Sequence, residues 1–169
     1  VGIGSDSASY GASVNIAAGG NLTATDSATR GVRIGSLADS ASATDVTLLA
    51  DGDIAIGGAT GYGALVGVKT PSGVSSVTIR AGEYGGGNLL LAATSRIKAG
   101  GQVALSARQS STTNGSITQN SGSIIYGGGV SFNAVGSASF NGSVTATTGT
   151  ISGLAGFAYG GQIGISTSP

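Results

Sequence analysis

The chain has 169 residues, of which seven are basic and seven acidic, so its formal net charge is zero and only 8% of its residues are charged. The charges are scattered along the sequence, which argues against a nucleic-acid or membrane footprint. A hydrophobic share of 40% excludes a disordered chain. The absence of Cys and His removes disulfides, thiolate chemistry and the commonest general base. The sequence therefore predicts no enzyme, no cofactor and no catalytic or metal-ligating residue.

Glycine is abundant and proline is rare, with 33 and 2 residues respectively, which excludes both collagen-like and proline-rich architectures. No shift in composition divides the chain, so residues 1–169 are expected to form a single unit. The sequence has no Met, no signal peptide and no apolar run of the roughly 18 residues that a membrane span needs. The absence of Met predicts that residues 1–169 are a single segment of a longer protein.

Short runs with apolar residues at positions i and i+2 recur along the chain, and this spacing is typical of strands with one buried face. Glycine-containing breaks separate them, and glycine supplies the positive φ that turns need. No stretch of helical length keeps an apolar stripe free of glycine. The pattern predicts about eighteen strands and no helix. The clearest strand runs begin at Val14, Val32, Val46, Val77, Val103 and Val130.

The runs also resemble one another at a nearly constant spacing. One motif begins at Val1, Val32 and Val66. A second begins at Val14, Val46, Val77, Val103 and Val130, and its last two intervals are shorter than its first two. A sequence period of this kind indicates units that bury their apolar faces against copies of themselves.

We therefore predict an all-β fold, a right-handed parallel β-helix, because most breaks suit corners between stacked strands and parallel crossovers are nearly always right-handed. A β-sandwich is the alternative, since it also consists of short alternating strands. The two folds differ in one feature. A β-helix stacks the valines of the second motif in one column, whereas a sandwich distributes them over two facing sheets.

The phrases Ser13-Val14-Asn15-Ile16-Ala17-Ala18-Gly19-Gly20-Asn21-Leu22, Val46-Thr47-Leu48-Leu49-Ala50-Asp51-Gly52-Asp53-Ile54 and Gly115-Ser116-Ile117-Thr118-Gln119 resemble the repeats of filamentous haemagglutinin-like adhesins. These are large exoproteins of two-partner secretion in Gram-negative bacteria. The resemblance covers most of the chain and implies a β-helical stalk that is secreted or displayed on the outer cell surface. The units here are longer and less regular than the common repeats of the family, and its amino-terminal secretion domain is not recognisable.

Two pairs of charged residues are candidates for a ligand face. Asp51 and Asp53 stand at i and i+2, so in a strand their carboxylates would share a face and could bind calcium or assist polysaccharide cleavage. A polar corner around Asp51-Gly52 is the simpler interpretation. Arg96 and Lys98 have the same spacing. Stacked with Arg80 and Arg108 they would form a basic stripe for a sulfated or uronic glycan, but solvated charges that protect strand edges are the simpler interpretation.

Three asparagines lie in N-x-[ST] acceptor patterns and are candidate glycosylation sites: Asn21, Asn114 and Asn141. Ordinary turn or ladder asparagines are the simpler interpretation.

The sequence favours a non-catalytic structural stalk segment of a bacterial adhesin or exoprotein. Its expected partners are neighbouring β-helix coils of the parent chain or copies of itself, together with a host or matrix glycan, and neither nucleic acid nor membrane insertion is expected. The alternative is a glycan-binding or polysaccharide-processing β-helix. It predicts a groove with aligned aromatic side chains, for which the candidates are Tyr10, Tyr62, Tyr84, Tyr126 and Tyr159.

Overall fold

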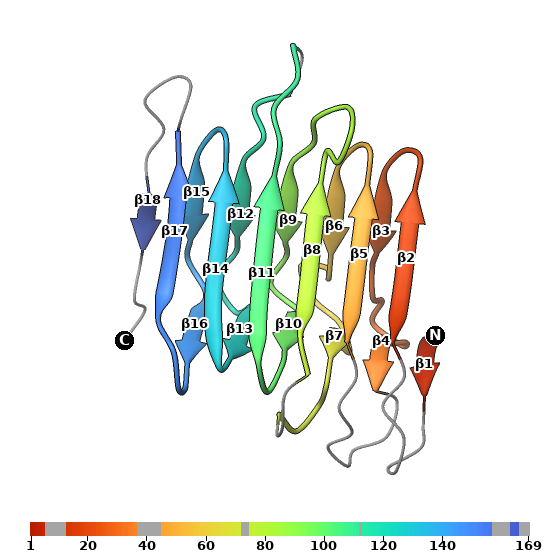
Figure 1. Ribbon diagram of the computed structural model, residues 1–169. Coiled ribbons are helices and arrows are strands. Elements are labelled where there is room, and N and C mark those ends of the chain that lie inside the picture. The colour runs from red at the N-terminus through yellow and green to blue at the C-terminus, as the bar shows by residue number, and fades with distance from the viewer. Residues whose placement is uncertain (6–12, 37–44, 72–74, 112, 157–162, 166–169) are drawn as a thin grey trace.

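The computed structural model describes residues 1–5, 13–36, 45–71, 75–111, 113–156 and 163–165, and these residues form eighteen strands and no helix. The strands make three parallel sheets of six strands each, which the chain visits in turn. In Figure 1 the near strands run upward, the chain crosses to the far strands, and the coil advances from right to left, which makes it right-handed. The predicted parallel β-helix is confirmed, and parallel pairing throughout the described residues excludes the β-sandwich.

The three sheets are named here A, B and C in the order in which the chain enters them. Sheet A contains β1 (Gly2–Ser5), β4 (Val32–Ser36), β7 (Ala64–Gly67), β10 (Ser95–Lys98), β13 (Ile124–Gly127) and β16 (Ser143–Ala146). Sheet B contains β2 (Val14–Ala18), β5 (Val46–Ala50), β8 (Val77–Ala81), β11 (Gln102–Ala107), β14 (Gly129–Ala134) and β17 (Ile151–Ala155). Sheet C contains β3 (Leu22–Ala24), β6 (Ile54–Ile56), β9 (Leu89–Leu91), β12 (Ile117–Gln119), β15 (Ala138–Phe140) and β18 (Ile163–Ile165).

The valines of the second sequence motif stack in one column of sheet B, as the β-helix prediction requires. The column runs through Val14, Val46, Val77, Val103, Val130 and Ile151. The last step, from Val130 to Ile151, is the shortest, so the shortening of the repeat towards the C-terminus continues to the last strand of the sheet.

The alignment of the first motif is wrong by two residues in its third copy. Val32 pairs with Ala64, and Ile34 pairs with Val66, so the third copy begins at Ala64 and not at Val66. A shift of two residues keeps the same side chains on the buried face of a strand. For that reason the similarity between the phrases could not fix the register.

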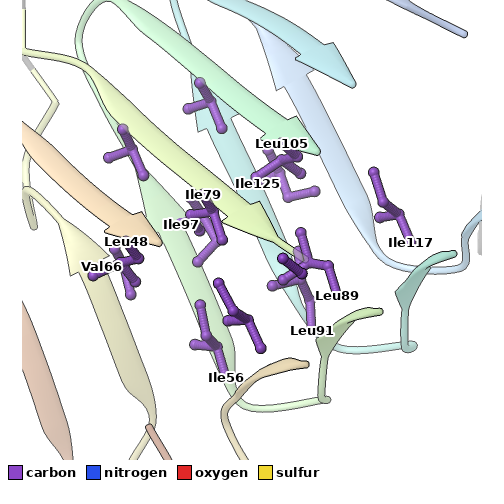
Figure 2. Packing of buried hydrophobic residues seen from close by; sticks show 14 of the residues in the cluster. Leu48, Ile56, Val66, Ile79, Leu89, Leu91, Ile97, Leu105, Ile117 and Ile125 are labelled. Carbon is purple, nitrogen blue, oxygen red and sulfur yellow. The ribbon is translucent and has the colours of Figure 1, made fainter. Parts of the chain in front are cut away.

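Alternation along each strand builds the core. Inward positions of adjacent coils carry Val, Ile, Leu and Ala, and Leu48, Ile79 and Ile97 are fully buried. Figure 2 shows such side chains from facing sheets converging between the strands. Each buried Leu or Ile stabilises the fold by roughly 1.5–3 kcal/mol through the hydrophobic effect, so the core is assembled from many similar contributions along the axis.

Glycine at the end of the sheet A strands lets neighbouring coils approach closely. Gly67 has φ +103°, and a Cβ there would collide with the backbone oxygen of Lys98 and contact the Val77 side chain. Gly35, its partner in the preceding coil, has φ +119°. Only glycine readily adopts this positive φ and has no side chain to collide with the next coil. The close approach of the coils at this position of β4 and β7 therefore requires glycine.

Candidate functional site

Arg96 and Lys98 lie on the outer face of β10, and they line a shallow hollow on sheet A. Both side chains are half-buried. Two further cations from other coils line the same hollow, together with an exposed tyrosine and a leucine. We call this feature the basic hollow. Apart from glycines, it is lined by Val1, Val32, Arg33, Tyr62, Leu65, Lys69, Arg96 and Lys98.

Strand register explains why residues so distant in sequence meet there. Leu65 pairs with Arg33 on one side and with Arg96 on the other, so the two arginines occupy one outward column with the leucine between them. Lys98 lies two residues beyond Arg96 on the same face. Charges that are scattered along the sequence are therefore gathered in space, because each turn of the coil returns the chain to the same face.

The guanidinium of Arg96 is held by backbone carbonyls. Its Nη1 donates to the carbonyl oxygens of Ser95 at 2.8 Å, Gly122 at 2.9 Å and Ala93 at 3.2 Å. These bonds attach the side chain to the next coil and restrict its orientation. Arg96 thus presents a positive charge at a fixed place on the sheet.

Arg80 and Arg108 do not stack with Arg96 and Lys98, so the conditional basic stripe of these four residues does not form. Arg80 belongs to β8 in sheet B, and its Nη1 lies 3.5 Å from the Oε1 of Glu83. The Arg108 Nη1 donates to the Glu83 carbonyl oxygen at 2.9 Å. These two arginines line a different hollow on sheet B, next to the segment between β11 and β12. The sequence showed the spacing within each strand but not the sheet to which each strand belongs.

Asp51 and Asp53 lie at the corner between β5 and β6, not in a strand. The Asp53 Oδ1 accepts the backbone N–H of Asn88 at 2.7 Å, and its own backbone N–H donates to the Asn21 Oδ1 at 2.9 Å. Asp51 and Asp53 therefore lie at a polar corner, as in the simpler interpretation of the sequence. Asp53 forms hydrogen bonds to both neighbouring coils.

Asp53 belongs to a ladder of side chains that runs along this corner. In each step a side-chain oxygen accepts the backbone N–H of the corresponding residue one coil further on. We call it the corner ladder, and it contains Asn21, Asp53, Asn88, Ser116 and Ser137. The ladder gives these corner amides acceptors within the protein, alongside backbone bonds between corners of neighbouring coils such as that from the Gly52 amide to the Gly20 carbonyl oxygen at 3.1 Å.

A second polar cluster, which the sequence interpretation missed, lies at the corner between sheets C and A. Asp26 is 5% exposed. Its Oδ1 accepts the Thr94 hydroxyl at 2.6 Å, its Oδ2 accepts the Gly63 amide at 2.8 Å, and the Gly58 amide donates to the Thr94 Oγ1 at 2.7 Å. Burial alone would raise the pKa of Asp26, but hydrogen bonds from Thr94, Gly63 and Gly58 lower it below its ordinary value. The cluster connects three coils, and only the register shows it, since its members are up to 68 residues apart.

The three candidate glycosylation sites differ in what their side chains contact. The Asn21 oxygen is engaged in the corner ladder. The Asn141 Nδ2 lies 3.4 Å from the Ser139 Oγ. Asn114 is exposed in the segment between β11 and β12, which extends beyond the sheets in Figure 1. Glycosylation stays a prediction, and Asn114 is the best placed of the three.

The tyrosines do not share one face in the described part of the chain. Tyr62 is 74% exposed and lies just before β7, and Tyr126 lies in β13, so both belong to the sheet A side. Tyr84 is 89% exposed at the corner between sheets B and C. Tyr10 and Tyr159 lie outside the described residues.

Among the residues described, no helix is long and apolar enough to cross a membrane, and no group of three or more acidic side chains gathers as metal ligands would. No known protein family, curated protein or solved structure matches the chain.

Proposed function

We propose that the chain is a non-catalytic structural segment of a secreted or surface-displayed adhesin or exoprotein fibre of a Gram-negative bacterium. One observation carries the proposal: parallel pairing continues without a break through all three sheets, over columns of similar apolar residues. The resemblance to filamentous haemagglutinin-like repeats supports the same role.

The geometry suits a stalk for a mechanical reason. The hydrogen bonds between strands lie along the axis of the coil, with about 4.8 Å between successive strands. Every coil is joined to the next by three strand pairings and by corner contacts such as the bond from the Ser116 amide to the Asn88 Oδ1. A force along the axis is therefore shared among many bonds, and a longer stalk requires only further coils.

The partners that we propose are further coils of the parent chain or copies of this chain. In each sheet the two terminal strands pair on one side only among the described residues: β1 and β16 in sheet A, β2 and β17 in sheet B, and β3 and β18 in sheet C. Unpaired parallel edges are templates for additional strands, so an added coil can extend the ladders without change of geometry.

Labelling of intact cells tests the surface location. Antibodies raised against the chain should label unpermeabilised cells that express the parent gene, and brief external protease treatment should remove the label. Labelling that appears only after permeabilisation would overturn the proposal.

A cleavage assay tests the absence of catalysis. The chain should release no reducing ends from neutral or uronate polysaccharides, and the Asp51→Asn, Asp53→Asn double variant should behave identically. Cleavage by the parent chain that the double variant loses would establish the polysaccharide-processing alternative instead.

A further inference from the structure

We propose that the basic hollow on sheet A binds an acidic oligosaccharide through the carboxylate groups of its uronic acid residues. This inference does not depend on the stalk role, because it concerns an outer face of the coil and not its continuity. It assigns a ligand site to the outer face of sheet A, in addition to the structural role of that sheet.

The first argument is the distribution of charge. Four of the seven basic residues of the chain line this one hollow, and no acidic residue is among the described residues that line it. Within the described part of the chain Arg96 and Lys98 form no ion pair, so they place positive charge on sheet A that no described acidic side chain compensates. A concave surface with charges of one sign concentrates ligands of the opposite sign.

The second argument is preorganisation. Arg96 has its Nη1 bound to backbone carbonyls, while its remaining guanidinium N–H groups have no partner among the described residues. The Lys98 ammonium forms no hydrogen bond or ion pair within the described part of the chain. A planar guanidinium held in one orientation binds a carboxylate through two parallel bonds at a reduced entropic cost. Arg33 and Lys69 have partners of their own, so we assign the binding of the carboxylate groups to Arg96 and Lys98.

The third argument is spacing and the nature of the floor. Lys98 is about 6.6 Å along the strand from Arg96. Arg33, which has a partner of its own, stands two strands from Arg96 in the same column, about 9.6 Å away. Separated charges of this kind fit an extended ligand with repeated anionic groups better than a single small ion. Between and beside them lie Leu65 and Tyr62, whose apolar surfaces can pack against the C–H faces of sugar rings.

The test is isothermal titration calorimetry of the whole chain. The ligands are oligogalacturonate, a sulfated oligosaccharide of similar length, a neutral oligosaccharide and inorganic phosphate. We expect oligogalacturonate to bind, more weakly as salt increases, with no binding of the neutral sugar. Tighter binding of the sulfated sugar would assign the same hollow to sulfate groups and overturn the carboxylate assignment. If inorganic phosphate bound as tightly as oligogalacturonate, the hollow would be a general anion site, and the assignment of an oligosaccharide ligand would be overturned.

Variants locate the site. Lys98→Gln, which removes a charge without removing a described contact, should weaken oligogalacturonate binding about tenfold, as expected for loss of one partly desolvated ion pair. Arg96→Lys should also weaken it, since the charge stays but the planar fork is lost. The matched control is Arg80→Gln on sheet B, which should bind as the unmodified chain does. No binding of either acidic sugar, or equal losses in Lys98→Gln and Arg80→Gln, would refute the proposal. Circular dichroism of each variant verifies that the coil is intact.

Discussion

Replacing Thr94 with valine should destabilise the coil strongly, although the two side chains have nearly the same shape. The change removes the 2.6 Å hydrogen bond to the Asp26 carboxylate and deprives the Gly58 amide of its acceptor. A hydrogen bond to a charged group contributes about 1.5–3 kcal/mol, and an unsatisfied buried group adds to the loss, so the free energy of unfolding should fall by ~2–4 kcal/mol. For a chain of this size that corresponds to roughly 4–16 °C in melting temperature.

The effect should depend on pH with a definite sign. The pKa of Asp26 is lowered in the folded chain, so its hydrogen bonds contribute stability above the unfolded value of about 3.9 and lose it as the pH falls through the folded pKa. Without Thr94, the side-chain hydrogen bond that helps to lower the pKa of Asp26 is lost, so this pKa should be less depressed in the variant than in the parent chain. The stability difference between the parent chain and Thr94→Val should therefore be full at pH 7 and shrink below pH ~4.

Urea unfolding followed by far-ultraviolet circular dichroism at pH 7 and pH 3 measures both quantities, provided that unfolding is cooperative, which coincident transitions at two wavelengths would establish. Thr94→Ser is the matched control because it keeps the hydroxyl, and it should lose less than ~1 kcal/mol, about one buried methyl group. A Thr94→Val chain as stable as Thr94→Ser, or a difference that grows on acidification, would refute the role assigned to the Asp26 carboxylate.

Three further substitutions test the packing, each by the same urea titration. Leu48→Ala should cost about 2–5 kcal/mol because the side chain is fully buried, whereas Leu49→Ala on the outer face should cost far less; equal losses would contradict the assigned register. Gly67→Ala should cost more than ~2 kcal/mol, combining positive φ with a backbone collision, while Gly19→Ala, with open space around its Cβ, should be nearly neutral. Asn88→Ala removes an acceptor in the corner ladder and should cost ~1 kcal/mol, and no loss would mean that water replaces it.

The fold was largely predictable because one physical signal repeats in every coil. Strand alternation and a nearly constant spacing between similar runs together require that Val14, Val46 and Val77 stack, and they do. Where the signal was degenerate, the prediction failed: moving Val66 by two residues preserves the buried face, and only the pairing of Ile34 with Val66 determines the register.

The polar sites were less predictable, because each one combines residues from several coils. Asp26 and Thr94 are 68 residues apart, and nothing in either local sequence indicates a contact. Arg96 and Lys98 were found as a pair, but their neighbours in the basic hollow depend on which strands share sheet A. The possible stacking with Arg80 depended on both strands lying in one sheet, and Arg80 lies in sheet B.

Gln119 is the clearest departure from the apolar pattern of the core. It occupies an inward position of β12, directly between Leu91 of β9 and Phe140 of β15, and it is fully buried. Its Nε2 donates to the Ser143 carbonyl oxygen at 3.1 Å and lies 3.4 Å from that of Ser123, while its Oε1 has no hydrogen-bond partner. A buried side-chain amide whose oxygen accepts no hydrogen bond lowers the stability of the fold, and an apolar residue at this position would avoid that loss.

Gln119→Leu should therefore stabilise the coil. Relief of the unsatisfied Oε1 is worth about 1–3 kcal/mol, against ~1 kcal/mol for the lost bond to Ser143, and the Ser123 carbonyl oxygen keeps the Ser143 amide as its donor at 3.0 Å. Urea unfolding should show a net gain of ~1 kcal/mol, because a leucine matches its neighbours in the column and fills a similar volume. Gln119→Glu, which places an unpaired acid at the same position, should instead be destabilised at pH 7 and recover part of the loss on acidification. If Gln119→Leu proved less stable than the parent chain, the Oε1 would have to be bound by water inside the coil, and the glutamine would be an anchoring residue of the core rather than a defect in it.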